Sequence, residues 1–472
     1  MQFSSIPRPA ALAAVTGMSD VPFWLDSPSR PAPRPPLTQD SEAGLVVVGG
    51  GFTGLWTALL AKEADPALDV LLLEGGRVAE GATGRNGGFV AASLTHGLVN
   101  GAERFADELP TLLRLGHENL RAIEETIVRH GIDCGFQWAG ELDVAVAEHQ
   151  VEDLRQQADL AARYGEPVEF LDAAQTRGRV DSPTYLAGLL DPTGAALVDP
   201  ARLAWGLLEA CARAGVVIHE GTPVLDLIDR GHAVEVFTPT ARVHAPRVAL
   251  ATNAYPPLLR RLRHYVVPVY DYVLVTEPLS DGQWAAIGWK GREGLSDAGN
   301  QFHYYRVTPD GRILWGGFDA VHHYGSRFDR AFEHDTSYFG HLAEHFLQTF
   351  PQLTGIRFTH GWGGAIDTCS RFSAFWGTAA SGRIGYVLGF TGLGVGASRF
   401  GALTMLDLLY SRDTERTRLR MVRTKPIPFP PEPMRSVGIS LTTRSLARAD
   451  ANGGRRNLWL RTLDAMGMGF DS

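Results

Sequence analysis

The sequence predicts a mixed α/β (α+β) fold, in which a unit built on a parallel sheet is interleaved with a second unit built on a β-sheet. Short apolar runs at 45–48 and 386–388 each lead into glycines and then a helical pattern, which is typical of parallel strands. A β-rich stretch between about 256 and 358 predicts the second unit. Because the strand signals stand on both sides of this stretch, we expect the first unit to be discontinuous.

The first half of the chain alternates strand and helix signals. A helix is predicted over about 55–62, and the apolar run 70–73 completes a strand-helix-strand pass. Apolar residues recur at helical spacing over 102–130, where we expect one long helix, bent at Pro110 and ended at Gly131.

Later signals return to strands. Asp199-Pro200 should open a helix that runs to about Arg213. Segments between 223 and 250 predict a small antiparallel excursion that returns to the parallel sheet. The run VVPVYDYVLVTE and a hairpin over 302–317, with its turn at Pro309-Asp310-Gly311, predict the second sheet, and a helix should follow over about 396–410.

Composition narrows the class of protein. A chain of 472 residues, 44% hydrophobic, can bury large cores, and its net charge of −8 without charge blocks does not suit a nucleic acid partner. Only Cys134, Cys211 and Cys369 are present, a set that supports neither a disulfide framework nor a zinc ribbon. No apolar run approaches the roughly 20 residues that cross a bilayer. We therefore expect a soluble, cytoplasmic protein without a membrane partner.

A glycine-rich hexapeptide carries the first functional signal. Gly49-Gly50-Gly51-Phe52-Thr53-Gly54 matches GxGxxG, follows a predicted strand and opens a predicted helix, and the acidic Glu74 ends the next strand. Gly49 suits the tight turn, Gly51 a close approach to a diphosphate, and Gly54 the packing of helix on strand. Glu74 should accept hydrogen bonds from ribose hydroxyls and disfavour NADP. The motif predicts a Rossmann-type dinucleotide site.

Further motifs carry a family resemblance. Gly81-Ala82-Thr83-Gly84-Arg85-Asn86-Gly87-Gly88 follows Glu74, and Asp199-Pro200, residues 251–255, 304–306 and 389–396 follow in order. With these motifs the chain resembles, over about 44–408, the FAD-dependent glycine and D-amino acid oxidase (DAO) family. The segment 81–88 is most similar to gamma-glutamylputrescine oxidase-like members. The resemblance implies a Rossmann-type FAD-binding domain interleaved with a β-sheet-based substrate domain.

The resemblance also implies a domain division. The FAD-binding domain would comprise 41–120, 195–255 and 360–410, and the substrate domain 121–194 and 256–359. Residues 1–40, rich in proline, are expected to form an extended arm that Phe23 and Trp24 could anchor. Residues 411–472 form a polar, arginine-rich C-terminal tail to which no role is assigned.

The cofactor site that the resemblance implies is non-covalent FAD, since Cys369 lies beyond the position of a flavin thioether. Loop 81–88 would lie along the diphosphate and flavin, Val224 would meet the adenine, and the turn from Gly392 would face the N1 and C2 carbonyl side of the ring. The predicted cofactor-binding residues are Gly49, Gly51, Phe52, Thr53, Gly54, Glu74, Gly75, Thr83, Arg85, Asn86, Gly87, Val224, Ala251, Thr252, Gly392, Leu393, Gly394 and Val395.

The substrate side departs from the family pattern. Where several relatives carry a basic residue for an α-carboxylate, this chain has Ile366, Thr391 and Gly396, so a larger amine or an amino acid derivative is the expected substrate. The predicted catalytic residues are Tyr304, Arg306 and Trp362. Strand alternation sends Tyr304 and Arg306 to one face of their strand.

The predicted reaction is hydride transfer from the α C–H of a small amine to flavin N5, giving an imine that water hydrolyses. The electron acceptor is left open between oxygen and another acceptor, since Lys290 falls in a polar loop rather than at the position of an oxygen-activating lysine. Two alternatives are an FAD dehydrogenase of a non-amine substrate with a non-oxygen acceptor, and a flavin-binding module without activity.

One motif points to different chemistry. His341-Leu342-Ala343-Glu344-His345 matches the HxxEH pattern of some zinc proteases. The apolar spacing of Phe339, Leu342, Phe346 and Phe350 favours an amphipathic helix instead, and no third ligand can be named, so no metal is predicted.

Overall fold

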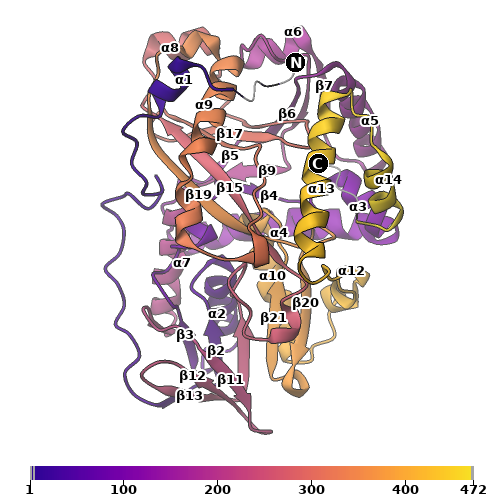
Figure 1. Ribbon diagram of the computed structural model, residues 1–472. Helices are drawn as coiled ribbons and strands as arrows, with labels where there is room; N and C mark the ends of the chain where they lie inside the picture. The colour runs from indigo at the N-terminus through magenta and orange to yellow at the C-terminus, as the bar shows by residue number, and fades with distance from the viewer. Residues whose placement is uncertain (1–2, 4–5, 469–472) are drawn as a thin grey trace.

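The computed structural model describes Phe3 and residues 6–468. It has two units in the view of Figure 1. The lower one contains β2(Leu45–Val48), β3(Val70–Leu73) and β21(Ile384–Leu388), and the upper one contains β15(Val267–Thr276), β17(His303–Val307) and β19(Phe358–Thr368). The mixed α/β fold expected from the sequence is confirmed. The boundaries between the two units at residues 120, 194, 255 and 359 stay a prediction.

The lower unit is built on a parallel sheet whose strands come from distant parts of the chain. Its centre is β2, whose four residues are all buried, as expected for a strand covered on both faces. The strand order is β10(Val217–His219)-β3(Val70–Leu73)-β2(Leu45–Val48)-β14(Arg247–Leu250)-β21(Ile384–Leu388)-β20(Phe375–Ala379), with β20 antiparallel.

The two faces of this sheet are covered by different layers. Leu45 and Val47 pack among α2(Phe52–Ala64), α7(Pro200–Arg213) and α10(Gly394–Leu409), while Val46 and Val48 face a smaller sheet. The predicted antiparallel excursion is confirmed, because it forms that sheet and returns through β14 beside β2. The smaller sheet has the order β1(Ser41–Glu42)-β13(Arg242–Ala245)-β12(Val234–Phe237)-β11(Asp226–Asp229).

The upper unit is built on a long mixed sheet. The predicted hairpin is confirmed as β17 and β18, and Gly311 takes a φ of 78° in its turn. The helix α9(Thr336–Thr349) packs against β15. The strand order is β19(Phe358–Thr368)-β15(Val267–Thr276)-β18(Ile313–Gly317)-β17(His303–Val307)-β16(Gly294–Asp297)-β6(Glu141–Ala145)-β8(Ala187–Asp191)-β7(Glu169–Asp172).

Further elements complete the two units. The strands β4(Phe89–Ala91), β9(Ala195–Leu197) and β5(Gln137–Trp138) form a small sheet. The helices α5(Glu148–Tyr164) and α6(Ala173–Arg179) pack on β8, and α8(Asp281–Ile287) lies near the 3₁₀ turn after α9. None of the helices in the described residues is long and apolar enough to span a membrane.

The long helix expected over 102–130 is divided in two. The structure has α3(Leu98–Phe105), a short 3₁₀ turn and α4(Leu109–His130). Pro110 stands in the first turn of α4, where its missing N–H costs no hydrogen bond, so the chain restarts a helix there instead of bending one. Gly131 ends α4 with a φ of 63°, as predicted.

The N-terminal arm is extended apart from α1(Pro9–Ala14), which packs on α9. Its predicted anchor is confirmed for Trp24, whose side chain is buried and whose indole N–H donates to Asn86 O at 2.9 Å. Leu25 packs on Gly84 of the same loop. The arm therefore supports the glycine-rich segment 81–88 from outside.

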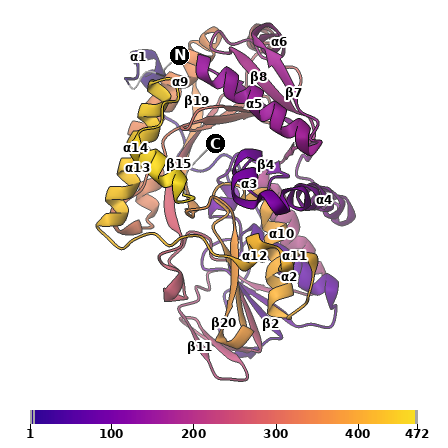
Figure 2. The ribbon, with the colours of Figure 1, turned by 90° about the vertical axis from the view of Figure 1, so that its right-hand side faces the viewer.

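The C-terminal tail is helical rather than simply polar. It forms α11(Glu415–Arg418), α12(Arg420–Arg423), α13(Met434–Ala451) and α14(Leu458–Ala465). Figures 1 and 2 show α13 and α14 side by side against the upper unit.

Replacing Trp24 by alanine should lower the free energy of unfolding by about 3–5 kcal/mol, because a buried indole and its hydrogen bond are lost. Urea denaturation checks the change. The matched control is Val21→Ala on the exposed part of the same arm, which should change stability by less than about 0.5 kcal/mol. Equal effects of the two variants would show that the arm is not anchored at Trp24.

Candidate active site

One cavity of about 1450 Å³ is lined by residues of both units and of the C-terminal tail. Pockets that hold a single drug-sized ligand are about 300–1,000 Å³, so this cavity has room for a large cofactor together with a small substrate. Of the predicted site residues, Gly54, Arg306 and Trp362 do not line it. Those that do are Gly49, Gly51, Phe52, Thr53, Glu74, Gly75, Thr83, Arg85, Asn86, Gly87, Val224, Ala251, Thr252, Tyr304, Gly392, Leu393, Gly394 and Val395.

The first glycine turn joins β2 to α2 and needs its glycines. Gly49 has a φ of 112°, and a Cβ there would lie 2.4 Å from Ala251 O. A Cβ on Gly54 would lie 1.8 Å from Gly49 O, so helix and turn touch backbone to backbone. The N-terminus of α2 faces the cavity, where its free amides suit a diphosphate.

Thr83 and Glu74 complete this end of the cavity. The hydroxyl of Thr83 accepts from the Phe52 amide at 3.0 Å. The Glu74 carboxylate accepts from the amides of Gly50 at 2.6 Å and Gly76 at 2.7 Å, and burial raises the pKa of this group. Each carboxylate oxygen keeps a further lone pair, so Glu74 can still accept from a ribose hydroxyl.

The side chains of loop 81–88 mainly hold the loop itself. Asn86 donates to Ala82 O and Thr83 O at 3.0 and 2.8 Å and accepts from the Gly88 amide at 2.8 Å. Arg85 forms an ion pair with Glu333 at 3.0 Å. Both residues line the cavity, but the donors that we expected to face a cofactor are engaged with protein partners.

Arg306 and Trp362 support the same loop from behind. The guanidinium of Arg306, 3% exposed, donates to Val198 O at 2.7 Å and Gly88 O at 3.2 Å, and burial lowers its pKa to about 9. The indole of Trp362 donates to Arg85 O at 2.9 Å. These contacts favour a positioning role over the catalytic role that we predicted for both residues.

Tyr304 lines the cavity and contacts a residue that the sequence reasoning missed. Its hydroxyl donates to Asp271 Oδ2 at 2.6 Å, and Asp271 also lines the cavity. Burial raises the pKa of Asp271 to about 6. The signal was present in the sequence, because Asp271 interrupts the apolar strand VVPVYDYVLVT. The ring of Tyr304 also packs against Gly87 of the loop.

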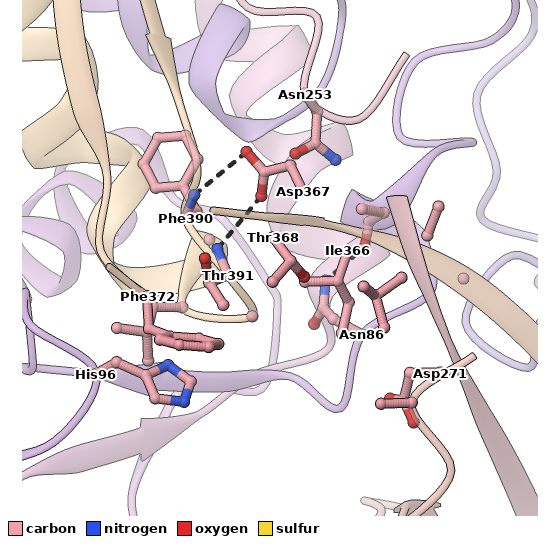
Figure 3. Close-up of a pocket in the computed structure, with 18 of the residues that line it drawn as sticks. Asn86, His96, Asn253, Asp271, Ile366, Asp367, Thr368, Phe372, Phe390 and Thr391 are labelled. Atoms are coloured by element: carbon pink, nitrogen blue, oxygen red, sulfur yellow. Dashed lines mark hydrogen bonds between the residues drawn. The ribbon is translucent and has the colours of Figure 1, made fainter. Parts of the chain in front are cut away.

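The second glycine turn lies between β21 and α10 and is held by Asp367 at the end of β19. The Asp367 carboxylate accepts from the amides of Gly389 at 2.6 Å, Phe390 at 3.2 Å and Thr391 at 3.3 Å, the last two drawn in Figure 3. The Asn253 amide nitrogen is 3.1 Å from both oxygens in the orientation that satisfies the two groups. Burial raises the pKa of Asp367 to about 7.

The turn presents open backbone to the cavity. Gly392 has a φ of 92°, and no atom lies within 4 Å of a Cβ built on Gly392 or Gly394, where α10 begins. His96 and Phe372 lie beside Thr391 (Figure 3), and burial lowers the pKa of His96 to about 4, so its imidazole is neutral at pH 7. Sequence reasoning did not find His96, which stands in a loop without a motif.

Cys369 and the HxxEH motif lie apart from this chemistry. Cys369 is buried and does not line the cavity, and its Sγ contacts Ser373 O and Gly389 O. In α9, His345 is hydrogen-bonded to His303, and Glu344 accepts from Arg8. The described residues contain no group of three potential metal ligands.

Replacing Gly54 by alanine should push α2 away from the turn, because the new Cβ would overlap Gly49 O. We expect a loss of stability of about 1–3 kcal/mol and a lower visible-to-ultraviolet absorbance ratio in the purified protein. Gly178→Ala is the matched control, since it lies in a helix with no atom within 4 Å of a Cβ. Normal flavin content in Gly54→Ala would refute the assigned role of the turn.

The chain is similar to several known oxidoreductases. Gamma-glutamylputrescine oxidoreductase of Escherichia coli (strain K12) is 32% identical over 403 residues, which cover 84% of this chain and 89% of that protein. The probable oxidoreductase OrdL of Haemophilus influenzae is 29% identical over 401 residues, covering 83% and 88%. The crystal structure of glycine oxidase from Geobacillus kaustophilus has the same fold, with a TM-score of 0.69 at 21% identity over 82% of this chain and 99% of that one.

The family match covers most of the chain. Residues 45–408 match the family described as FAD dependent oxidoreductase (DAO). The match spans both glycine turns, the loop 81–88 and the strands that carry Asp271 and Tyr304. The chain therefore belongs to the DAO family of FAD-dependent oxidoreductases.

Proposed function

We propose that this protein oxidises a small, positively charged amine, with non-covalently bound FAD as the hydride acceptor. The observation that carries the proposal is that both glycine turns and the Asp271–Tyr304 pair face one cavity. When bound, FAD supplies a two-electron acceptor for a hydride. The turn at Gly49 suits its diphosphate, and the open amides from Gly392 onward suit the electron-rich edge of its ring.

The charges that line the cavity support a cationic substrate. The carboxyl groups of Glu141, Asp143 and Asp271 line it, and burial raises the pKa of each, that of Asp271 to about 6. A bound ammonium group would stabilise their ionised forms. Several basic residues of the lining already have acidic partners: Arg85 pairs with Glu333, Arg330 with Glu80, Arg456 with Asp464 and His117 with Glu166.

The activities for which two relatives are named support an amine substrate. These relatives are gamma-glutamylputrescine oxidoreductase and sarcosine oxidase subunit beta, whose names refer to amines. The positions Ile366, Thr391 and Gly396, where a carboxylate clamp was expected in relatives, carry no charge. These three uncharged positions favour an amine without a carboxylate beside the reacting carbon, whereas some relatives are named for the amino acids sarcosine and glycine.

In the proposed reaction the substrate loses a proton, then a hydride, and is finally hydrolysed. The ammonium first gives a proton to the Asp271 carboxylate, which leaves a lone pair on nitrogen. The α carbon would then give up a hydride, for which bound FAD would supply the two-electron acceptor, while that lone pair forms the C=N bond of a protonated imine. Water adds to the imine and releases a carbonyl compound and ammonia or a smaller amine. Tyr304 holds Asp271 in place for the first step through its 2.6 Å hydrogen bond.

Anaerobic incubation with primary amines and diamines should bleach the flavin absorbance of the purified protein, whereas hydroxy acids should not. The measurement is the visible spectrum. Bleaching by hydroxy acids alone would favour the FAD dehydrogenase of a non-amine substrate, and no bleaching by either class would favour a flavin-binding module. Peroxide release in air then distinguishes oxygen from another acceptor.

Replacing Asp271 by asparagine should lower kcat/KM for an amine by about 10²–10⁴, because the proton acceptor is removed. The pKa of Asp271 is raised to about 6, so its carboxylate is ionised above and protonated below that pH. The activity of the unmodified enzyme should therefore fall as the pH drops through about 6, and the variant should lose this limb of the pH profile.

The matched control is Asp281→Asn at the exposed start of α8, which should keep both activity and pH profile. An acidic limb that persists unchanged in Asp271→Asn would exclude Asp271 as the group that titrates.

A further inference from the structure

The C-terminal tail lines the cavity although it lies outside the family match, which ends at residue 408. Figure 2 shows α13 and α14 on the side of the upper unit that faces α3 and α5, and residues of α5 line the same cavity. The tail therefore adds a wall that the family core does not provide. The cavity-lining residues of α13 and α14 are Met434, Arg435, Gly438, Ile439, Thr442, Thr443, Leu446, Trp459, Leu460 and Leu463.

One face of α13 points into the cavity. Ile439, Thr442, Thr443 and Leu446 follow at the spacing of i, i+3, i+4 and i+7, which places them on the same side of the helix. The opposite side carries Leu441, 43% exposed. These four side chains are aliphatic or hydroxyl-bearing and carry no charge. Arg435, one turn before Ile439 on the same face, is charged, but its guanidinium is bound to Ser326 and His264.

The hydroxyls of this face are already engaged as donors. Thr442 donates to Gly438 O at 2.9 Å and Thr443 to Ile439 O at 3.1 Å. The indole N–H of Trp459 on α14 donates to the hydroxyl of Thr442 at 3.0 Å. With its polar groups satisfied within the helix pair, this wall suits an uncharged, largely aliphatic part of a ligand.

Specific contacts hold the wall against the upper unit. The Asp450 carboxylate near the end of α13 accepts from the amides of Asn300 and Gln301, each at 3.1 Å, and from the Asn300 side chain at 2.5 Å. At the other end, Arg435 donates to Ser326 Oγ at 2.7 Å and lies 2.9 Å from His264 Nδ1. Asn300 and Gln301 also line the cavity, so the hydrogen bonds that hold the end of α13 lie at the cavity itself.

We propose that α13 and α14 are the substrate-specificity wall of this enzyme: they bind the uncharged aliphatic chain that extends from the amine. This inference rests on the proposed function, in which the carboxylates of the family core hold the ammonium group. The two ends of the substrate are thus recognised by different parts of the chain. The C-terminal tail of the protein then selects the length and bulk of the substrate's alkyl chain, and the carboxylates of the family core select its positive charge.

The test uses Leu446→Trp, which adds bulk to the inward face, with Leu441→Trp on the outward face as the matched control. The probes are alkyltrimethylammonium ions of increasing chain length. A quaternary ammonium lacks the nitrogen lone pair that imine formation needs, so it binds without being oxidised. Affinity is measured by calorimetric titration of the flavin-loaded full-length protein.

We expect Leu446→Trp to weaken binding of the longest ions at least tenfold and to leave the shortest ions and the flavin content unchanged. Leu441→Trp should bind the whole series like the unmodified protein. Ile439→Trp is a second inward variant for the case that Leu446→Trp does not fold. Equal affinities for both variants, a loss that is the same at all lengths, or no binding of any ion to the unmodified protein would overturn the proposal.

Asp450 is a positioning residue in this scheme. Asp450→Ala should raise KM for long-chain primary amines several-fold, because α13 loses its hydrogen bonds to Asn300 and Gln301. The kcat and the KM for short amines should stay constant, since the carboxylates of the family core are unchanged. A fall in kcat at all chain lengths would contradict that role. Failure of every amine to bleach the flavin would refute the proposed function alone, since the binding series tests the wall without oxidation.

Discussion

The buried carboxylate of Asp367 joins three segments that lie far apart in the sequence. Asp367 is the penultimate residue of β19 in the upper unit. Its carboxylate accepts from three successive amides of the turn between β21 and α10, and it lies beside Asn253 after β14. Burying a carboxylate is costly unless hydrogen bonds offset the lost hydration. The donors that offset it are the backbone of the second glycine turn, so the position of this turn in the lower unit depends on a strand of the upper one.

The loop 81–88 is likewise held by side chains from distant segments that hydrogen-bond to its backbone. Trp24, Trp362 and Arg306 donate to backbone carbonyls of Asn86, Arg85 and Gly88 from three directions. The loop has little regular secondary structure of its own, so side chains behind it replace the hydrogen bonds that a helix or sheet would supply. At this loop, the cavity surface is therefore held in place by residues that do not line the cavity.

How far the sequence could predict these features depends on the kind of signal. Gly49 and Gly54 were predictable because only glycine fits a backbone-to-backbone contact, and the excursion through β11 to β13 followed from its alternating pattern. Alternation places Arg306 on a face of its strand but does not say what covers that face. The tail helix α13 has little amphipathic pattern, and its contacts through Asp450 with Asn300 are tertiary, so composition alone suggested a polar tail.

The extended arm has a consequence for how the two units are held together. Its backbone pairs at Ser19 with Thr359 and Gly361, and at Arg34 with the carboxylate of Glu220. Thr359 and Gly361 belong to β19 of the upper unit, whereas Glu220 directly follows β10 of the lower one. One extended segment therefore links both sheets, and a chain break between Ser19 and Arg34 would uncouple the two attachments.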